Sequence, residues 1–325
     1  MRPFAFTAPR SVPEALSAYG EDSVYLAGGT SLVDLMKLDV ARPRRVVDIN
    51  SLPLHGITAD DDGLWIGALE RLGDIARDPL VVAGYPVLRQ ALLASASPQL
   101  RNMASLGGNL LQRTRCGYFR DTATPCNKRA PGSGCSALSG EHRGHAVLGT
   151  GPACVATHPS DPAVALVALG ATLELRDGEG VRTVPLEEFH RLPGETPHRE
   201  NVLRAGELIT RVRVPRLPWA TRSLYVKVRD RRSYEFALVS AAVALDLREG
   251  VVRDARIALG GVGTKPWRVP AAEDALRGRE LTLHTAAEAA EHTGAGARPL
   301  AGNAFKIRLM RQTVTHALLR LGGRP

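Results

Sequence analysis

Aromatic residues are scarce in this chain. Phe, Trp and Tyr together make up 5% of the residues, against a hydrophobic content of 44%. The hydrophobic cores must therefore consist mostly of Ala, Val and Leu. The net charge of +9 favours an acidic partner surface. However, the basic residues are dispersed and no aromatic stacking face accompanies them, so we expect no binding of nucleic acid.

Long apolar runs are also lacking. No stretch approaches the length needed to span a membrane. The N-terminal sequence MRPFAFTAPRSVPEAL has neither an uninterrupted apolar region nor a small-residue cleavage site. We therefore expect a soluble chain with no membrane span, which could be exported only together with a signal-bearing partner.

Several familiar motifs are missing. The chain has no G-x-G-x-x-G fingerprint, no P-loop and no closely spaced C-x2–4-C pair. No Ser/His/Asp set or pair of carboxylates stands out as catalytic machinery. A Rossmann-type nucleotide site and a zinc knuckle are therefore disfavoured, and we predict no catalytic residue in this chain.

The 325 residues are enough for two or three compact units. We place a first α/β unit at residues 1–54, a second unit at 55–219, and a third at 220–325, where alternating apolar patterns predict an antiparallel sheet. Helices are expected at Ser11–Tyr19, Ser31–Lys37, Tyr85–Ala96, Ala271–Leu276 and Phe305–Leu321, and strands at Val24–Ala27 and Val46–Ile49. The segment SPQLRNMASLGGN is expected to be irregular, and ELITRVRVP is expected to be an edge strand.

The four cysteines of the chain, Cys116, Cys126, Cys135 and Cys154, lie within a single segment. Residues between the first and third are rich in Pro, Gly, Ser and Thr, which predicts a loop. Four thiolates are the ligand set of one cubane iron–sulfur cluster. Two disulfides or a zinc ion remain open alternatives.

Basic residues are concentrated around these cysteines: Arg113, Arg115, Arg120, Lys128, Arg129 and Arg143. Cations next to a negatively charged cluster stabilise it and raise its reduction potential. The alternative interpretation is a basic loop exposed to solvent.

Two Gly-Gly segments are candidates for holding an anionic cofactor. The first is Leu26, Ala27, Gly28, Gly29, Thr30, Ser31 and Leu32, between a predicted strand and a predicted helix. The second contains Ala104, Ser105, Gly108 and Asn109. Glycines allow the backbone to approach a pyrophosphate closely, although each segment alone could equally be an ordinary tight turn.

Ser160, Asp161 and Lys227 each have two interpretations. Ser160 or Asp161 is expected to cap the helix that follows the last cysteine, and both could contact a flavin or its ribose. Lys227 could be a surface lysine on a strand or a cation beside a flavin carbonyl.

Five motifs in a fixed order carry a resemblance to a known family: LAGGTSL, ASLGGN, HPSDPAVAL, GELITRVRVP and KVRDRRSYEFALVSAAVAL. With these, essentially the whole chain resembles the FAD-binding medium subunit of the xanthine dehydrogenase and aldehyde oxidase family of molybdenum hydroxylases. The cysteine segment, together with CNKRAPGSGC and LPGETPH, is most similar to the [4Fe-4S]-containing flavin subunit of bacterial periplasmic aldehyde oxidoreductases.

The resemblance implies an α+β fold of the vanillyl-alcohol-oxidase (PCMH) type, with two α/β subdomains that hold FAD and a C-terminal antiparallel sheet with helices. It implies an insertion loop at residues 112–157 that binds a [4Fe-4S] cluster through the four cysteines. It places Leu26–Leu32 at the pyrophosphate, Ala104, Ser105, Gly108 and Asn109 in a second FAD loop, and Ser160, Asp161, Ile209 and Lys227 near the flavin or the adenine.

The resemblance also implies an electron-transfer role. Substrate oxidation would occur at a molybdenum cofactor on a large partner subunit. Electrons would then pass through [2Fe-2S] clusters of a small subunit to FAD on this chain, in a heterotrimer. Ser95 stands where the eukaryotic dehydrogenases have a phenylalanine, and Tyr234 stands where they have an acidic residue. Both departures disfavour NAD as the terminal acceptor, and ferredoxin, quinone, oxygen or an artificial dye is equally compatible.

Other functions stay open: the flavin subunit of a 4-hydroxybenzoyl-CoA reductase-like or xanthine dehydrogenase-like enzyme, a stand-alone flavin oxidase, or a non-enzymatic iron–sulfur sensor. For location we expect the periplasm, reached by export with a signal-bearing partner, and the cytoplasm as the close second.

Overall fold

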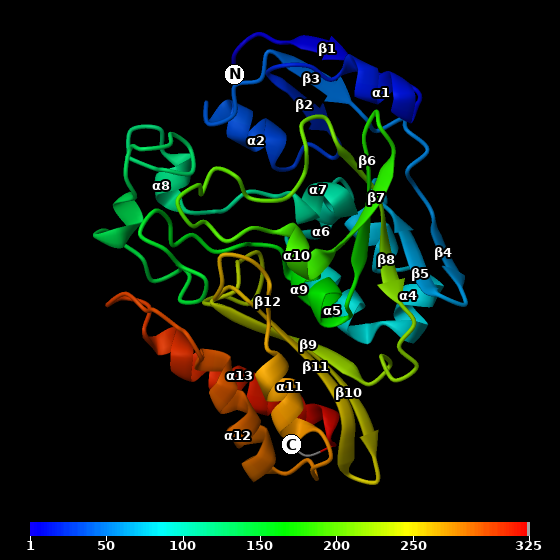
Figure 1. Cartoon of the computed structure of the whole chain (residues 1–325), viewed down its shortest axis with the longest axis vertical. Coiled ribbons are helices and arrows are strands. Elements are labelled where there is room, and N and C mark those ends of the chain that lie inside the picture. The colour runs from blue at the N-terminus through cyan, green and yellow to red at the C-terminus, as the bar shows by residue number, and fades with distance from the viewer. Residues whose placement is uncertain (324–325) are drawn as a thin grey trace.

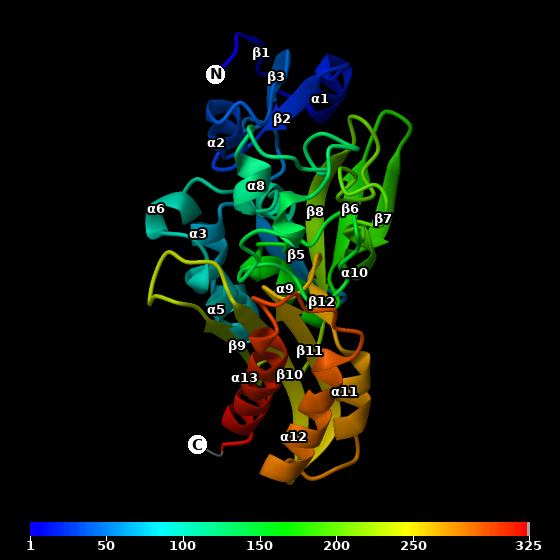
Figure 2. The same cartoon turned by 90° about the vertical axis from the view of Figure 1, so that its left-hand side faces the viewer.

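Three β-sheets follow one another along the long axis of the molecule. The computed structural model describes residues 1–323, with the N-terminal sheet at one end and the C-terminal sheet and its helices at the other (Figure 1). The cysteine segment lies to one side, between the N-terminal sheet and the middle of the molecule, as Figure 2 shows from that side.

The N-terminal sheet is parallel, with the strand order β1-β3-β2. Its elements are β1 (Ala5–Thr7), α1 (Val12–Ala18), β2 (Ser23–Leu26), α2 (Leu32–Lys37) and β3 (Arg45–Asp48). As expected, Ser11 caps α1, because its hydroxyl accepts a hydrogen bond of 3.3 Å from the Glu14 amide. The expected helices and strands of this unit are confirmed, whereas β1 was not foreseen.

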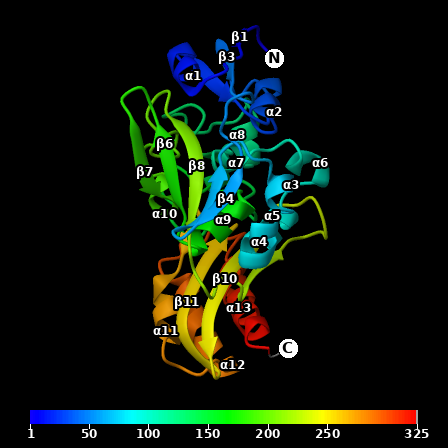
Figure 3. The same ribbon diagram turned by 90° about the vertical axis from the view of Figure 1, so that its right-hand side faces the viewer.

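The middle sheet is antiparallel and has the order β4-β5-β8-β6-β7, seen in Figure 3. Its strands are β4 (Ile57–Asp60), β5 (Gly63–Gly67), β6 (Thr172–Arg176), β7 (Val181–Pro185) and β8 (Leu208–Pro215). The helices around it are α3 (Leu72–Ile75), α4 (Pro79–Gly84), α5 (Pro86–Ala94), α6 (Pro98–Arg101), α7 (Leu106–Leu110), α9 (Asp161–Ala168) and α10 (Leu186–Phe189).

Two expectations for this unit are wrong. Strand β8 is central, since Val212 pairs with Ile66 on one side and Leu173 on the other. We expected an edge strand at the end of a turn-rich stretch, but the strand has neighbours on both sides, and its Arg211 stacks on Trp65 of β5, 4.3 Å from the ring centroid.

The segment around the second glycine pair, expected to be irregular, contains the short helices α6 and α7. Each begins at a serine that caps it: Ser97 accepts from the Leu100 amide and Ser105 from the Gly108 amide, both at 3.2 Å. These caps offset the low helix propensity of the glycines.

The C-terminal sheet is antiparallel with the order β12-β11-β10-β9, as expected. Its strands are β9 (Ser223–Val228), β10 (Val239–Arg248), β11 (Val251–Gly260) and β12 (Trp267–Arg268). Helices α11 (Pro270–Leu276) and α13 (Phe305–Leu321) pack against it, and α12 (Leu283–Glu291) packs against these two helices. Helix α12 was missed, although Thr282 and Thr285 form a capping box at its start.

Helix α9 joins the middle and C-terminal sheets. All eight of its residues are buried. The core that it shares with the middle sheet also contains Tyr225, Ala242 and Ala258 of the C-terminal sheet. Within residues 1–323, no helix is long and apolar enough to cross a membrane.

Candidate functional site

The first Gly-Gly loop connects β2 to α2. Gly29 has φ +70°, a conformation that side chains rarely adopt. Ser31 precedes α2 but does not cap it. Its hydroxyl instead accepts a hydrogen bond of 3.1 Å from the Arg115 guanidinium, which links this loop to the cysteine segment.

The two glycine loops touch each other at Gly28. A Cβ added at Gly28 would lie 1.9 Å from the carbonyl oxygen of Met103, next to Ala104. A side chain at this position would therefore push the loops apart. In the second loop, a Cβ at Gly107 would lie 3.1 Å from the Cβ of Ala68, so this segment also packs closely on its support.

A cavity of about 440 Å³ opens where the loops meet. Nine of the predicted site residues line it: Ala27, Gly28, Gly29, Thr30, Ser31, Leu32, Ser105, Gly108 and Ile209. Tyr19 and Tyr25 line it as well, and the sequence had not indicated them. Leu26, Ala104 and Asn109 do not line it. The close backbone approach, the loop hydroxyls and the aromatic wall fit a dinucleotide with an anionic centre.

Ser160 and Asp161 line a second cavity, of about 220 Å³, with residues 235–238 and Arg143. Ser160 caps α9 by accepting from the Ala163 amide at 3.1 Å. Its hydroxyl also donates to the Asn109 side chain at 2.6 Å, so Asn109 connects the second glycine loop to this cavity.

Lys227 lies behind this cavity rather than on the surface. Its ammonium forms a 2.8 Å ion pair with Asp161, and both side chains are less than one-tenth exposed. The Tyr225 hydroxyl donates to the same carboxylate at 2.6 Å. Burial raises the pKa of Asp161, while Lys227 and Tyr225 act in the opposite direction.

The two residues that differ from the eukaryotic dehydrogenases, Ser95 and Tyr234, differ in their exposure to solvent. Ser95 is buried, and its hydroxyl donates to the Leu92 carbonyl at 2.7 Å. Tyr234 is exposed, with φ +51°, in the loop between β9 and β10.

All four cysteines line one small cavity. Their thiols are free, so the disulfide alternative is not realised. Residues Cys126 and Cys135 face each other across an antiparallel bridge. Burial raises the pKa of the Cys116 thiol to about 11 and also raises that of Cys154. Across the described part of the chain, no three His, Cys, Asp or Glu side chains are grouped to hold a single metal ion.

This donor set fits a cluster better than a single ion. One ion draws its ligands to one point, whereas the corners of a cubane are separate iron atoms that keep the thiolates farther apart. Four cysteines around one cavity supply the number of thiolates that one cubane cluster requires.

The basic residues around the cysteines are held by specific partners. Arg120 and Arg115 pair with Asp34, at 2.8 and 3.3 Å. Arg143 pairs with Asp230 at 2.7 Å, and Arg129 donates to main-chain carbonyls, including that of Tyr118 at 2.7 Å. The interpretation of a loose, solvated basic loop is therefore wrong.

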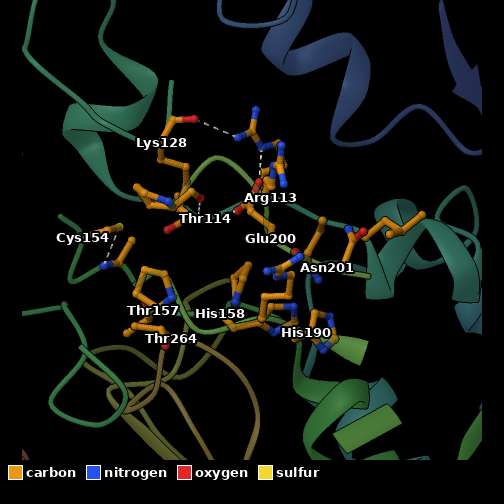
Figure 4. Close-up of a pocket in the computed structure, with 18 of the residues that line it drawn as sticks. Arg113, Thr114, Lys128, Cys154, Thr157, His158, His190, Glu200, Asn201 and Thr264 are labelled. Carbon is orange, nitrogen blue, oxygen red and sulfur yellow. Dashed lines mark hydrogen bonds and ion pairs between the residues drawn. The ribbon is translucent and has the colours of Figure 1, made fainter. Parts of the chain in front are cut away.

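Glu200 is the third carboxylate that holds the cysteine segment (Figure 4). It pairs with Arg113 and, at 2.8 Å, with Lys128. Burial would raise the pKa of Glu200, but the two cations outweigh burial and lower it. The sequence did not single out Glu200, since its partners lie more than 70 residues away.

Glu200 and its two cations also line a further cavity, of about 130 Å³, and two histidines lie on its other side (Figure 4). The rings of His158 and His190 are 4.3 Å apart. Burial holds the pKa of His158 well below its usual value and lowers that of His190 to about 4, so both rings are neutral at pH 7. His190 was not foreseen.

The family profiles match almost the whole chain. The profile described as the FAD binding domain in molybdopterin dehydrogenase matches residues 2–217, and the CO dehydrogenase flavoprotein C-terminal domain matches residues 224–324. The chain therefore belongs to the family of FAD-binding medium subunits of the molybdenum hydroxylases. It is an FAD-containing oxidoreductase subunit.

Individual relatives agree with this assignment. The chain is 48% identical over 321 residues to the aldehyde oxidoreductase FAD-binding subunit PaoB of Escherichia coli, covering 97% of each chain. It is 31% identical to the glyceraldehyde dehydrogenase medium chain of Sulfolobus acidocaldarius, covering 86% of this chain and 82% of the relative.

Solved structures share the fold. Carbon monoxide dehydrogenase from Hydrogenophaga pseudoflava gives a TM-score of 0.76 at 29% identity, covering 98% of this chain and 96% of that chain. Quinoline 2-oxidoreductase from Pseudomonas putida gives 0.77 at 26% identity, covering 99% and 98%.

Glu200 should make stability sensitive to acid. Because its pKa is lowered in the folded chain, its ion pairs stabilise the fold above the ordinary value of 4.5 and are lost as the pH falls through the folded-state pKa. Glu200→Gln should lower the free energy of unfolding by about 1–3 kcal/mol at pH 7. Denaturant unfolding from pH 7 to pH 3 should show this difference shrinking below about pH 4.5.

Glu195→Gln is the matched control, because Glu195 is exposed in the same segment. It should change stability little at any pH. A constant difference between Glu200→Gln and the unaltered chain across the range would contradict the ion-pair assignment.

Proposed function

We propose that this chain is the electron-transfer flavin and iron–sulfur subunit of a molybdenum-dependent aldehyde oxidoreductase. The observation that carries the proposal is the arrangement of two cavities, one lined by both glycine loops and the other by all four cysteines. The 48% identity to a relative named as an aldehyde oxidoreductase subunit supports the substrate class. We further propose that the FAD fold is of the vanillyl-alcohol-oxidase type.

The glycine loops would hold FAD through the main chain. Gly28 permits the two loops to meet, Gly29 allows the turn into α2, and the hydroxyls of Thr30 and Ser31 face the same cavity. The Asn109–Ser160 hydrogen bond would fix the second loop against the start of α9. Behind it, the Asp161–Lys227 pair would place a fixed charge distribution beside the second cavity.

The four cysteines would ligate one [4Fe-4S] cluster. When bound, FAD exchanges electrons in pairs or singly, and a cluster exchanges them singly. The protein's contribution is to bury Cys126 and Cys154 and to hold the Lys128 cation at the cysteine cavity, with Arg115 and Arg120 fixed by Asp34 in the same segment. Burial and nearby positive charge are two of the factors that set a cluster potential.

We also propose the partners and the location. The partners are a large subunit with the molybdenum cofactor and a small subunit with [2Fe-2S] clusters, and the external acceptor is a carrier such as ferredoxin or quinone. The complex would be periplasmic, exported after folding with the small partner. Loading of a cluster in the cytoplasm supports export in the folded state.

Gly28→Ala tests the FAD assignment. The new Cβ meets the Met103 carbonyl, and overpacking of this kind costs about 1–3 kcal/mol. Separated loops should bind FAD roughly tenfold or more weakly, since each 1.4 kcal/mol is tenfold in affinity. Flavin content of the purified chain, read by absorbance and by release of FAD, is the measurement.

Gly84→Ala is the control, because no atom of the described residues 1–323 outside the immediate neighbours lies within 4 Å of a Cβ added there. It should retain the flavin content of the unaltered chain. Full flavin content in Gly28→Ala, at unchanged stability, would rule out the loop contact as a requirement for FAD.

Cys126→Ser tests the cluster. Removing one thiolate should eliminate the iron and the cluster signal in electron paramagnetic resonance while leaving most of the FAD, because the flavin loops are in a different cavity. Iron, labile sulfide and flavin are measured in protein isolated anaerobically. If the unaltered chain, isolated anaerobically, contains almost no iron or contains two disulfides, the cluster assignment is wrong.

Purification of the tagged chain from its native cell tests the complex. A molybdenum-containing large chain and a small iron–sulfur chain should accompany it, and deletion of the small chain's leader should retain all three in the cytoplasm. Aldehyde oxidation by this chain alone would instead favour a stand-alone flavin oxidase. If the chain is found in the cytoplasm of cells with all partners intact, the proposed export is wrong, but the proposed electron-transfer role is unaffected.

A further inference from the structure

His145 lies against one of the four cysteines. Its Nε2 atom is 3.2 Å from the Sγ of Cys116. The other ring nitrogen, Nδ1, is buried and has no hydrogen-bond partner within residues 1–323. The imidazole therefore makes its polar contact with sulfur alone among the groups around it.

The main chain around His145 is fixed by helix α13. The carbonyl of His145 accepts hydrogen bonds from the Lys306 ammonium at 2.9 Å and from the Asn303 amide at 3.3 Å. Lys306 is fully buried and also donates to the carbonyls of Gly144, at 3.0 Å, and Gly261, at 2.7 Å. The C-terminal unit thus positions the imidazole beside Cys116.

The chemistry of a cluster ligand decides the direction of this contact. A thiolate bound to iron has no proton and can only accept a hydrogen bond. A neutral imidazole has one N–H, and since no acceptor lies at Nδ1, only a proton on Nε2 has an acceptor, the Cys116 sulfur. The contact is then an Nε2–H···S bond in which His145 is the donor.

We propose that His145 is a positioning residue that donates a hydrogen bond to the Cys116 thiolate and so raises the reduction potential of the cluster. The inference rests on the proposed [4Fe-4S] cluster. Hydrogen bonds to the sulfurs stabilise the more negative, reduced form of an iron–sulfur cluster. The Ala156 amide makes a similar contact to Cys154 at 3.4 Å, but it belongs to the main chain. Of these two donors, substitution can remove only His145.

The test is a redox titration of the cluster in the complete complex, followed by electron paramagnetic resonance. His145→Leu removes the donor at similar size, and His145→Gln keeps an N–H donor. We expect the potential in His145→Leu to fall by the equivalent of roughly a tenfold change in the one-electron equilibrium constant, about 59 mV. The potential of His145→Gln should fall less.

His142→Leu is the matched control. His142 lies in the same segment, but its ring bonds to the Gly140 carbonyl and the Gly302 amide rather than to sulfur. Its variant should keep the original potential. A second measurement, electron–nuclear double resonance after exchange into D2O, should show a coupled exchangeable deuteron that weakens in His145→Leu.

Iron content separates the outcomes. An iron-replete His145→Leu complex with unchanged potential and unchanged deuteron coupling would overturn the role of His145 while leaving the cluster intact. Loss of iron in both His145 variants would assign the residue to holding the cluster, not to tuning it. An unaltered complex without iron in this chain would overturn the cluster and the inference together. If His145→Leu does not fold, the potential and deuteron coupling of His145→Gln decide alone.

Discussion

Burial of helix α9 between two sheets is the constraint on which the candidate site depends. All of its residues are buried, and its core includes residues from both the middle and the C-terminal sheets. A helix in this position cannot shift without disturbing its packing against both sheets. Its first residues, Ser160 and Asp161, are therefore held in fixed places, where they connect Asn109 on one side and Lys227 on the other.

The Asp161–Lys227 pair shows why such fixed geometry matters. Two opposite charges that are almost fully buried gain from each other only if their positions are well defined and further hydrogen bonds satisfy them. Tyr225 and the Ala94 carbonyl supply those bonds, at 2.6 and 3.1 Å. Removing either charge would leave the other uncompensated in a nonpolar setting, which is costlier than losing a surface ion pair.

Much of the site was predictable because its parts are local. The glycine loops, the serine cap of α9 and the four cysteines are short motifs whose chemistry can be read from neighbouring residues. The partners are not local. Glu200 and His145 entered no motif, because their importance arises from contacts with residues 87 and 29 positions away. The same reason explains β8, which was expected at an edge although it lies between β5 and β6, two strands from distant parts of the chain.

The cysteine segment is tied to each of the three units by an ion pair with a carboxylate: Asp34, Glu200 and Asp230. These pairs join residues 86 or 87 positions apart, so they form only after long stretches of chain have closed. During synthesis, the thiols therefore emerge before Glu200 and Asp230 exist to fasten the segment around them. The segment that carries the four thiols can therefore be fastened only in the order of synthesis, first to Asp34, then to Glu200 and last to Asp230.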